Sequence, residues 1–182
     1  MLERKGAVVW DADRAAHELM APGSEAHRAV ARRFGPGILR EDGAIDRPAL
    51  GRRVFGNAEE LKALNALVHP AVLAQMRAWR AEEQAKGRPA LAVVPLLYEA
   101  GAEQGWDAVI CVGAPKEAVL KRLLERGLSA EDAERRLSAQ MPVEMKMERA
   151  DYAVWNGGSL EELEQKLTTI WLDILQKQGT RR

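Results

Sequence analysis

Three short apolar runs constrain the fold of this chain more than any other feature of its sequence. They are residues 7–10 (AVVW), 90–94 (ALAVV) and 108–112 (AVICV), and residues 152–155 (YAVW) form a weaker fourth candidate. None of them alternates apolar with polar residues, and helical patterns lie between them. Runs of this kind are typical of strands in a parallel sheet that helices cover on both faces. The sequence therefore predicts an α/β fold.

The segment between the first two apolar runs is long and reads as helical throughout. A crossover between parallel strands needs only about a dozen residues, so this segment is more than a connection. It reads as a helical insertion at the carboxyl end of a strand, where α/β proteins hold their ligands. Within it, Pro70 disfavours helix at His69. The sequence thus predicts a boundary there, followed by a long helix that ends near Gly87.

Capping residues predict where several other helices begin. Asn57 followed by Glu60, and Ser159 followed by Glu162, have the spacing of capping boxes. Ser129 is the first residue of the helical pattern SAEDAERRLSAQ and is the expected N-cap of that helix.

Composition excludes several classes of protein. The 182 residues include 27 Lys and Arg and 27 Asp and Glu, so no net charge favours nucleic acid or a membrane surface. No apolar run approaches the ~18 residues that span a bilayer, and the start MLERKGA lacks the apolar core of a signal peptide. The single cysteine, Cys111, is expected to be a buried, unreactive thiol. We therefore expect a cytoplasmic protein with no nucleic-acid or membrane partner.

Two acids, Asp11 and Asp13, follow the first apolar run in VVWDADRAAH. If the strand geometry continues, both side chains face the same side, at a sheet edge where a ligand binds. One acid could accept the proton of an attacking hydroxyl, and the other could bind Mg²⁺ through water. The alternative is that Asp13 is the N-cap of the helix that RAAHELM predicts.

Arg122 and Arg126 lie four residues apart in VLKRLLERG and so share one helix face. Because guanidinium groups match phosphate oxygens in shape and charge, the pair could clamp a phosphate. Charges on a solvated helix face are the alternative. Arg135 and Arg136, in the segment 129–140, are open to the same two interpretations.

Six segments of the chain together carry a family resemblance: WDADRAAHELMAPGS, ARRFGPGILREDGAIDRPALGRRVF, LNALVHPAV, VVPLLYEAG, LKRLLERG and ADYAVWNGGSLEEL. In this order they resemble the dephospho-CoA kinases, over nearly the whole chain. The resemblance implies transfer of the ATP γ-phosphate to the ribose 3′-hydroxyl of dephospho-CoA, the last step of coenzyme A biosynthesis, with Mg²⁺. An adenylate or nucleoside kinase would not explain these segments together.

The resemblance also implies an architecture. It is that of a P-loop kinase, with a parallel sheet flanked by helices, a helical CoA-binding insertion and a small helical lid. The nucleotide-kinase core would be residues 1–13, 88–128 and 141–182, the insertion residues 14–87 and the lid residues 129–140.

One part of the family pattern is not found in residues 1–182. It is the phosphate-binding loop GxxxxGK[ST], which in the family follows the central first strand, about 20 residues before the DAD motif. We therefore expect the central first strand to be missing, the natural protein to begin earlier, and this chain alone to be inactive. The alternative is a non-catalytic protein without the loop, which either binds CoA or dephospho-CoA or has a regulatory role.

Residue roles follow from the same resemblance. It implies that Asp13 is the general base and that Arg122 contacts the transferring phosphate. Acceptor-substrate contacts would include Asp11, Arg14 and His69. Two more are expected from their positions: His17 lies one turn after Asp13 on the same helix face, and Glu99 follows the second apolar run. Nucleotide contacts would be Arg126, Arg135 and Asn156. Asp11 is also the candidate for Mg²⁺, through water. A purely structural hydrogen bond is the alternative for His69.

Overall fold

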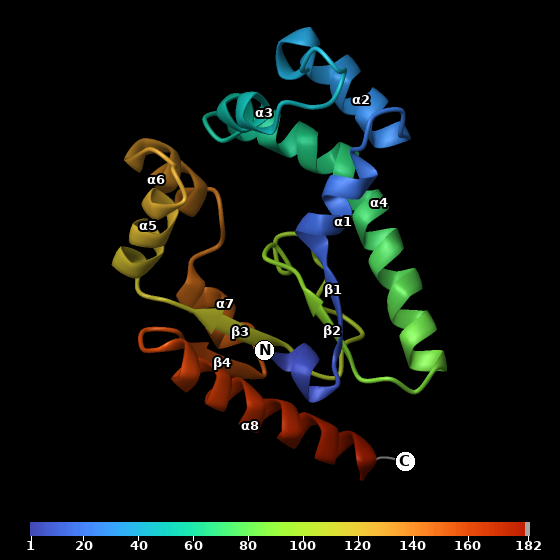
Figure 1. The fold of residues 1–182 in the computed structure, drawn as a ribbon, viewed down its shortest axis with the longest axis vertical. Helices are drawn as coiled ribbons and strands as arrows, with labels where there is room; N and C mark the ends of the chain where they lie inside the picture. The colour runs from blue at the N-terminus through green and yellow to red at the C-terminus, as the bar shows by residue number, and fades with distance from the viewer. Residues whose placement is uncertain (181–182) are drawn as a thin grey trace. The chain divides into compact units, whose positions relative to one another are not determined.

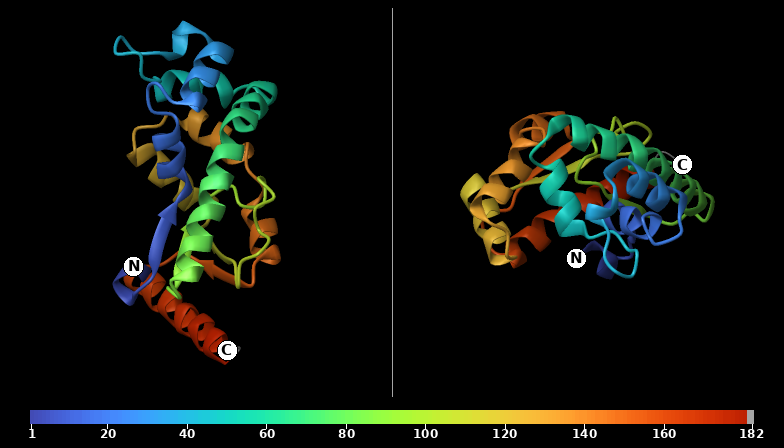
Figure 2. Two further views of the ribbon diagram at one scale, coloured as in Figure 1. Left: turned by 90° about the vertical axis from the view of Figure 1, so that its right-hand side faces the viewer. Right: turned by 90° about the horizontal axis from the view of Figure 1, so that it is seen from above.

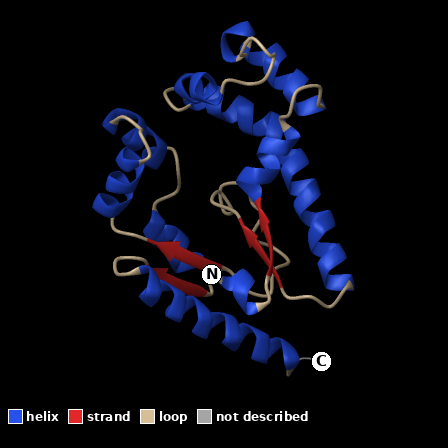
Figure 3. Cartoon of the chain, viewed as in Figure 1, coloured by secondary structure: helices blue, strands red, loops and turns tan. Residues whose placement is uncertain are grey.

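The computed structural model describes residues 1–180 and divides into two compact units. The middle unit is Val9–Pro95, and the terminal unit is Met1–Val8 with the described residues from Leu96 onward. Four strands occur in the described residues: β1 (Val8–Asp11), β2 (Ala90–Val93), β3 (Ile110–Gly113) and β4 (Tyr152–Trp155). Each coincides with an apolar run, to within two residues at either end. Helices flank the strands (Figure 3), so the predicted α/β class is confirmed.

The middle unit is mainly helical. Its two strands, β1 and β2, pair with each other. Its helices, all between these strands in the sequence, are α1 (Ala12–Leu19), α2 (Glu25–Phe34), the short 3₁₀ turn η2 (Pro36–Ile38), α3 (Arg47–Val54) and α4 (Ala58–Ala85). The long helical segment expected between the first two strands is therefore present (Figure 1).

One hydrophobic core holds these helices together. Its most buried side chains, each at most 2% exposed, are Val30, Phe34, Ile38 and Val54. Ala12 of α1 and Val68 of α4 belong to the same core. Helix α4 packs against α1, α2 and α3, and α1 runs alongside it (Figure 2). The core thus places the start of α1 and the start of α3 on one scaffold.

The predicted helix boundary at His69 and Pro70 is wrong, because α4 continues through both residues. A proline inside a helix has no N–H to donate, so the carbonyl of Ala66 loses its usual partner. Figure 1 shows that the axis of α4 changes direction along its length. Val68 and Val72, on either side of the proline, are both buried in the core. Their burial offsets the lost hydrogen bond.

The terminal unit contains the parallel pair β3 and β4, in register from Ile110 opposite Tyr152 to Gly113 opposite Trp155. Its helices are η1 (Leu2–Lys5), α5 (Lys116–Glu125), α6 (Ala130–Ser138), α7 (Val143–Arg149) and α8 (Leu160–Gly179). Helices α7 and α8 pack against the strands (Figure 1). A Cβ atom on Gly113 would lie 2.7 Å from the sulfur of Met147, so glycine permits the close approach of α7.

The predicted helix starts are confirmed. The side chain of Asn57 accepts hydrogen bonds from the backbone of Glu59 (3.0 Å) and Glu60 (3.2 Å), at the start of α4. Ser129 caps α6. At α8 the full reciprocal capping box is present between Ser159 and Glu162. Local side-chain chemistry therefore decides where these helices begin.

The structure bears on two expectations from composition, one about membrane-spanning helices and one about the thiol of Cys111. Within residues 1–180, no helix is both long and apolar enough to cross a bilayer. Cys111, on β3, is half-buried, and burial raises the pKa of its thiol. A thiol with a raised pKa stays protonated near neutral pH, as expected for an unreactive cysteine. The cytoplasmic location stays a prediction.

Candidate active site

The two acids of the DAD segment lie where β1 gives way to α1. Asp11 ends the strand and is the N-cap of α1, because its Oδ1 accepts a hydrogen bond from the backbone N–H of Arg14 at 2.9 Å. Asp13 lies in the first turn of the helix. The alternative that Asp13 is the N-cap is therefore wrong, and the strand geometry does not continue as far as Asp13.

The electrostatic surroundings of Asp13 favour its protonated form. Burial raises the pKa of this carboxyl group, and the neighbouring negative charge of Asp11 raises it further. The positive charge of Arg47 acts in the opposite direction and lowers the pKa of Asp13. Despite these neighbours, Asp13 remains accessible to solvent. A reachable carboxylate with a raised pKa is a better proton acceptor than an ordinary one.

Two histidines belong to the same unit. His17 lies on α1, one turn after Asp13, and is exposed. His69 lies on α4, is half-buried, and its pKa is lowered by burial, which favours the neutral imidazole. We refer to five candidate residues of the middle unit together as the acceptor cluster: Asp11, Asp13, His17, Arg47 and His69. Within this set, Asp11 and Arg47 are near enough to Asp13 to act on its charge.

Arg14, a further predicted substrate contact, has an ion-pair partner on its own helix. Its Nε donates a hydrogen bond to Oε1 of Glu18 at 2.9 Å, and both side chains are exposed. This is an ion pair between neighbouring turns of α1, of a kind that stabilises the folded state only slightly. A substrate contact by Arg14 stays a prediction.

Two residues predicted to contact ATP meet in the terminal unit. Nη2 of Arg122, on α5, donates a long hydrogen bond of 3.4 Å to the carbonyl of Asn156. The backbone N–H of Asn156 donates to the carbonyl of Gly113 at 2.7 Å, directly after β4. The pairing of β3 with β4 therefore positions the arginine's partner. Arg126 is exposed at the C-terminal end of α5, one turn after Arg122.

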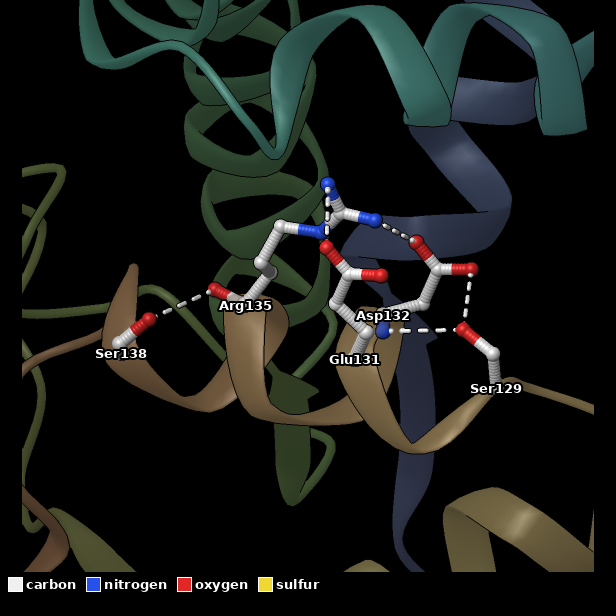
Figure 4. A network of polar contacts seen from close by, with 5 residues as sticks. All are labelled: Ser129, Glu131, Asp132, Arg135 and Ser138. Carbon is white, nitrogen blue, oxygen red and sulfur yellow. Dashed lines mark hydrogen bonds and ion pairs between the residues drawn. The ribbon is translucent and has the colours of Figure 1, made fainter.

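Arg135 of the predicted lid is held on its own helix (Figure 4). Its Nη2 donates to Oδ1 of Asp132 at 2.9 Å, and its Nη1 lies 3.6 Å from Oε1 of Glu131. Asp132 in turn accepts a hydrogen bond from the hydroxyl of the capping residue Ser129 at 2.8 Å. A phosphate contact by Arg135 would have to replace these intrahelical pairs.

Glu99 also has partners within the protein. Its Oε1 accepts hydrogen bonds from the backbone N–H of Met141 (2.9 Å) and from Nζ of Lys146 (2.7 Å). Burial alone would raise the pKa of Glu99, but these hydrogen bonds hold the pKa below its ordinary value. The carboxylate thus ties the loop after β2 to the region of α7. A substrate contact by Glu99 stays a prediction.

Arg47 was not among the site residues predicted from the sequence. Asp46 caps α3 by accepting from the backbone N–H of Ala49 at 3.0 Å, so Arg47 is the first residue of that helix. An acidic cap followed by Pro48 is a start signal that could have placed Arg47 in a first turn. No local signal could have shown that Asp13 is its neighbour.

The fold and the site together define a class of protein. Helices flank parallel strands, an acid follows one strand, and arginines lie on a helix that follows another, as in the α/β phosphotransferases of the P-loop kinase fold. Two solved structures support this class. A Thermus thermophilus protein described as TT1252 has 36% identity and a TM-score of 0.71, covering 94% of this chain and 87% of that one. Dephospho-CoA kinase from Campylobacter jejuni has 28% identity and a TM-score of 0.65, covering 95% of this chain and 87% of that one.

The sequence comparisons define the family. The family profile described as dephospho-CoA kinase matches residues 1–162. A dephospho-CoA kinase of Geobacter sulfurreducens is 46% identical over 175 residues, covering 94% of this chain and 88% of the relative. A dephospho-CoA kinase of Symbiobacterium thermophilum is 45% identical over 175 residues, covering 94% of this chain and 72% of the relative. The chain belongs to the dephospho-CoA kinase family. Its function is that of the family, ATP-dependent phosphorylation of dephospho-CoA, which confirms the prediction from its motifs.

Proposed function

We propose that Asp13 is the general base that accepts the proton of the ribose 3′-hydroxyl of dephospho-CoA as the phosphate is transferred. The observation that supports this role is the position of Asp13 in the first turn after β1, with a pKa raised by burial and by Asp11. The acid needs to be ionised before transfer and to hold a proton after it. A raised pKa makes the second condition easier to meet, at neutral pH, than it is for an ordinary aspartate.

On the donor side, we propose that Arg122 stabilises the charge that develops on the transferring phosphate. Arg126 and the lid residue Arg135 would contact other phosphate oxygens of ATP, and Asn156 would contact the nucleotide. The contact between Arg122 and the carbonyl of Asn156 supports a shared role for these two residues. At 3.4 Å that contact is weak, so the guanidinium can exchange it for a charged oxygen at little cost.

We also propose that Asp11 contacts Mg²⁺ through water. The cap uses Oδ1 of Asp11, and Oδ2 has no hydrogen-bond or ion-pair partner among residues 1–180. Mg²⁺ usually keeps several waters and needs few protein carboxylates beside the substrate phosphates, so one free oxygen fits this role. When bound, the ion would neutralise charge on the ATP phosphates.

A phosphate-binding loop is the remaining requirement. Backbone N–H groups, a lysine and a hydroxyl cradle the phosphates in such enzymes, and residues 1–182 contain no GxxxxGK[ST] segment. We propose that transfer needs this loop. The test compares the 182-residue chain with a loop-extended protein, in which a strand and a GxxxxGK[ST] loop are fused ahead of Met1.

The expected result is that both proteins bind dephospho-CoA in calorimetry, and that only the loop-extended protein transfers phosphate. Phosphorus NMR of the product locates the new phosphate on the ribose. Transfer at equal rates by the two proteins would refute the requirement for the loop. Binding without transfer by both would favour the alternative of a non-catalytic binding protein.

Neutralising Asp11 should change the pH dependence of the reaction. Because the charge of Asp11 raises the pKa of Asp13, Asp11→Asn should lower that pKa. The base is then ionised at lower pH, so the acid limb of kcat against pH moves to lower pH. Asparagine can still accept the capping hydrogen bond, so α1 should persist. The measurement is kcat between about pH 4 and 8 in the loop-extended protein, and an acid limb that moves upward would contradict the pairing of these acids.

A further inference from the structure

We propose that Arg47 binds the diphosphate of the acceptor substrate, dephospho-CoA, while the 3′-hydroxyl of the same nucleotide lies at Asp13. This inference deepens the function proposed above and rests on the role given there to Asp13. Arg47 lies in the segment ARRFGPGILREDGAIDRPALGRRVF, which carries part of the family resemblance, but no role was predicted for it. Three observations carry it: the placement of Arg47, its freedom from internal partners, and the charge balance of the acceptor cluster.

The placement follows from the core of the middle unit. Ala12, which precedes Asp13, and Val68, which precedes His69, are both buried in that core. Ile45 and Leu50, on either side of Arg47 in the sequence, are buried in the same core. The three polar side chains therefore belong to residues that flank one packed cluster. Helix α4 packs against both α1 and α3 and so brings the three helices together.

Arg47 is close to Asp13 but does not bond to it. The two charges are near enough for each to shift the pKa of the other group. Among residues 1–180, however, Arg47 forms no ion pair within 4.0 Å and no side-chain hydrogen bond. Other arginines of the unit do have partners: Arg14 pairs with Glu18 at 2.9 Å, and Arg33 with Glu60 at 3.0 Å. The guanidinium of Arg47 thus keeps its donors available for a ligand.

The charge balance indicates which part of the substrate Arg47 would bind. Dephospho-CoA carries its negatively charged diphosphate on the same ribose that bears the 3′-hydroxyl. Two carboxylates, Asp11 and Asp13, would repel this anion as the hydroxyl approaches the base. Arg47 is a permanent cation beside them, and its planar fork matches phosphate oxygens. Because it stands beyond contact distance of Asp13, the two groups can hold different ends of the nucleotide.

The test uses Arg47→Gln in the loop-extended protein, with Arg52→Gln as the matched control. Arg52 lies on the same helix, is exposed and, like Arg47, loses one positive charge on substitution. We expect Arg47→Gln to raise the KM for dephospho-CoA by about tenfold or more, the loss of a charge-assisted hydrogen bond, and to leave the KM for ATP unchanged. Arg52→Gln should change neither. Arg47→Lys, which keeps the charge, should restore part of the affinity.

Two outcomes would overturn the proposal. In the first, Arg47→Gln and Arg47→Lys are equally impaired and both unfold at lower temperature, which indicates a structural role. In the second, the KM for dephospho-CoA is unchanged and only the acid limb of kcat moves to higher pH, which means that Arg47 acts on Asp13 alone. The role of Asp13 is judged separately, from the turnover of Asp13→Asn. That variant can fail its test while the effect of Arg47 on KM persists.

Discussion

Asp13→Asn should lower kcat of the loop-extended protein by about 10²–10⁴-fold, the usual contribution of a positioned general base. Asparagine is almost the same size as aspartate but cannot accept the proton of the ribose hydroxyl. Because Asp11 and not Asp13 caps α1, the substitution leaves the start of the helix intact. The affinity for dephospho-CoA, measured by calorimetry, should therefore change little.

The matched control is Glu41→Gln, which neutralises an exposed acid of the same unit, outside the acceptor cluster. It should leave kcat unchanged. A decrease of less than about tenfold in Asp13→Asn would refute the assignment of Asp13 as the base. A large decrease accompanied by loss of dephospho-CoA binding would point instead to a substrate-binding role.

Arg122→Ala should lower kcat by about 10³-fold or more, the lower end of what an arginine on a transferring phosphate contributes. Arg122→Lys keeps the charge but not the two-pronged geometry, so its kcat should lie between those of alanine and arginine. Stability should hardly change, because the internal hydrogen bond of Arg122 is long, at 3.4 Å. The measurements are kcat and the two KM values, with thermal unfolding as the check on folding.

Lys121→Gln is the control for this experiment, since Lys121 is exposed on the same helix and lies 4.0 Å from its partner Glu125. It should behave like the unchanged protein. If Arg122→Lys raises only the KM for dephospho-CoA, then Arg122 belongs to the acceptor pocket and its assignment to the phosphate of ATP is wrong.

The strands were predictable from the sequence because each is a short apolar run with no polar alternation. The helix starts at Asn57, Ser129 and Ser159 were predictable for a similar reason, since each depends on one side chain and the few backbone groups after it. The continuation of α4 through Pro70 was not predictable. It depends on burial of Val68 and Val72 against residues distant in the sequence, which no local pattern records.

The candidate site, too, was only partly predictable from the sequence. The two acids could be found because they are close together in the sequence, whereas their geometry could not, since the strand ends at Asp11. Arg47 was missed because its relation to Asp13 exists only after the core has formed. Arg135 and Glu99 were predicted to contact ligands, but the sequence did not show that each has partners within the protein.

Helix α4 also affects how the middle unit unfolds locally. One helix packs against α1, α2, α3 and strand β2, so none of these elements can separate from the rest without losing contacts to it. Amide hydrogens in the cores of these elements should therefore exchange with deuterium at similar free energies, as a single cooperative unit. Amides of α3 that exchange far more easily than those of α1 would contradict this. Asp13, His17, Arg47 and His69 lie on α1, α3 and α4, so opening of this unit should disrupt all four positions at once.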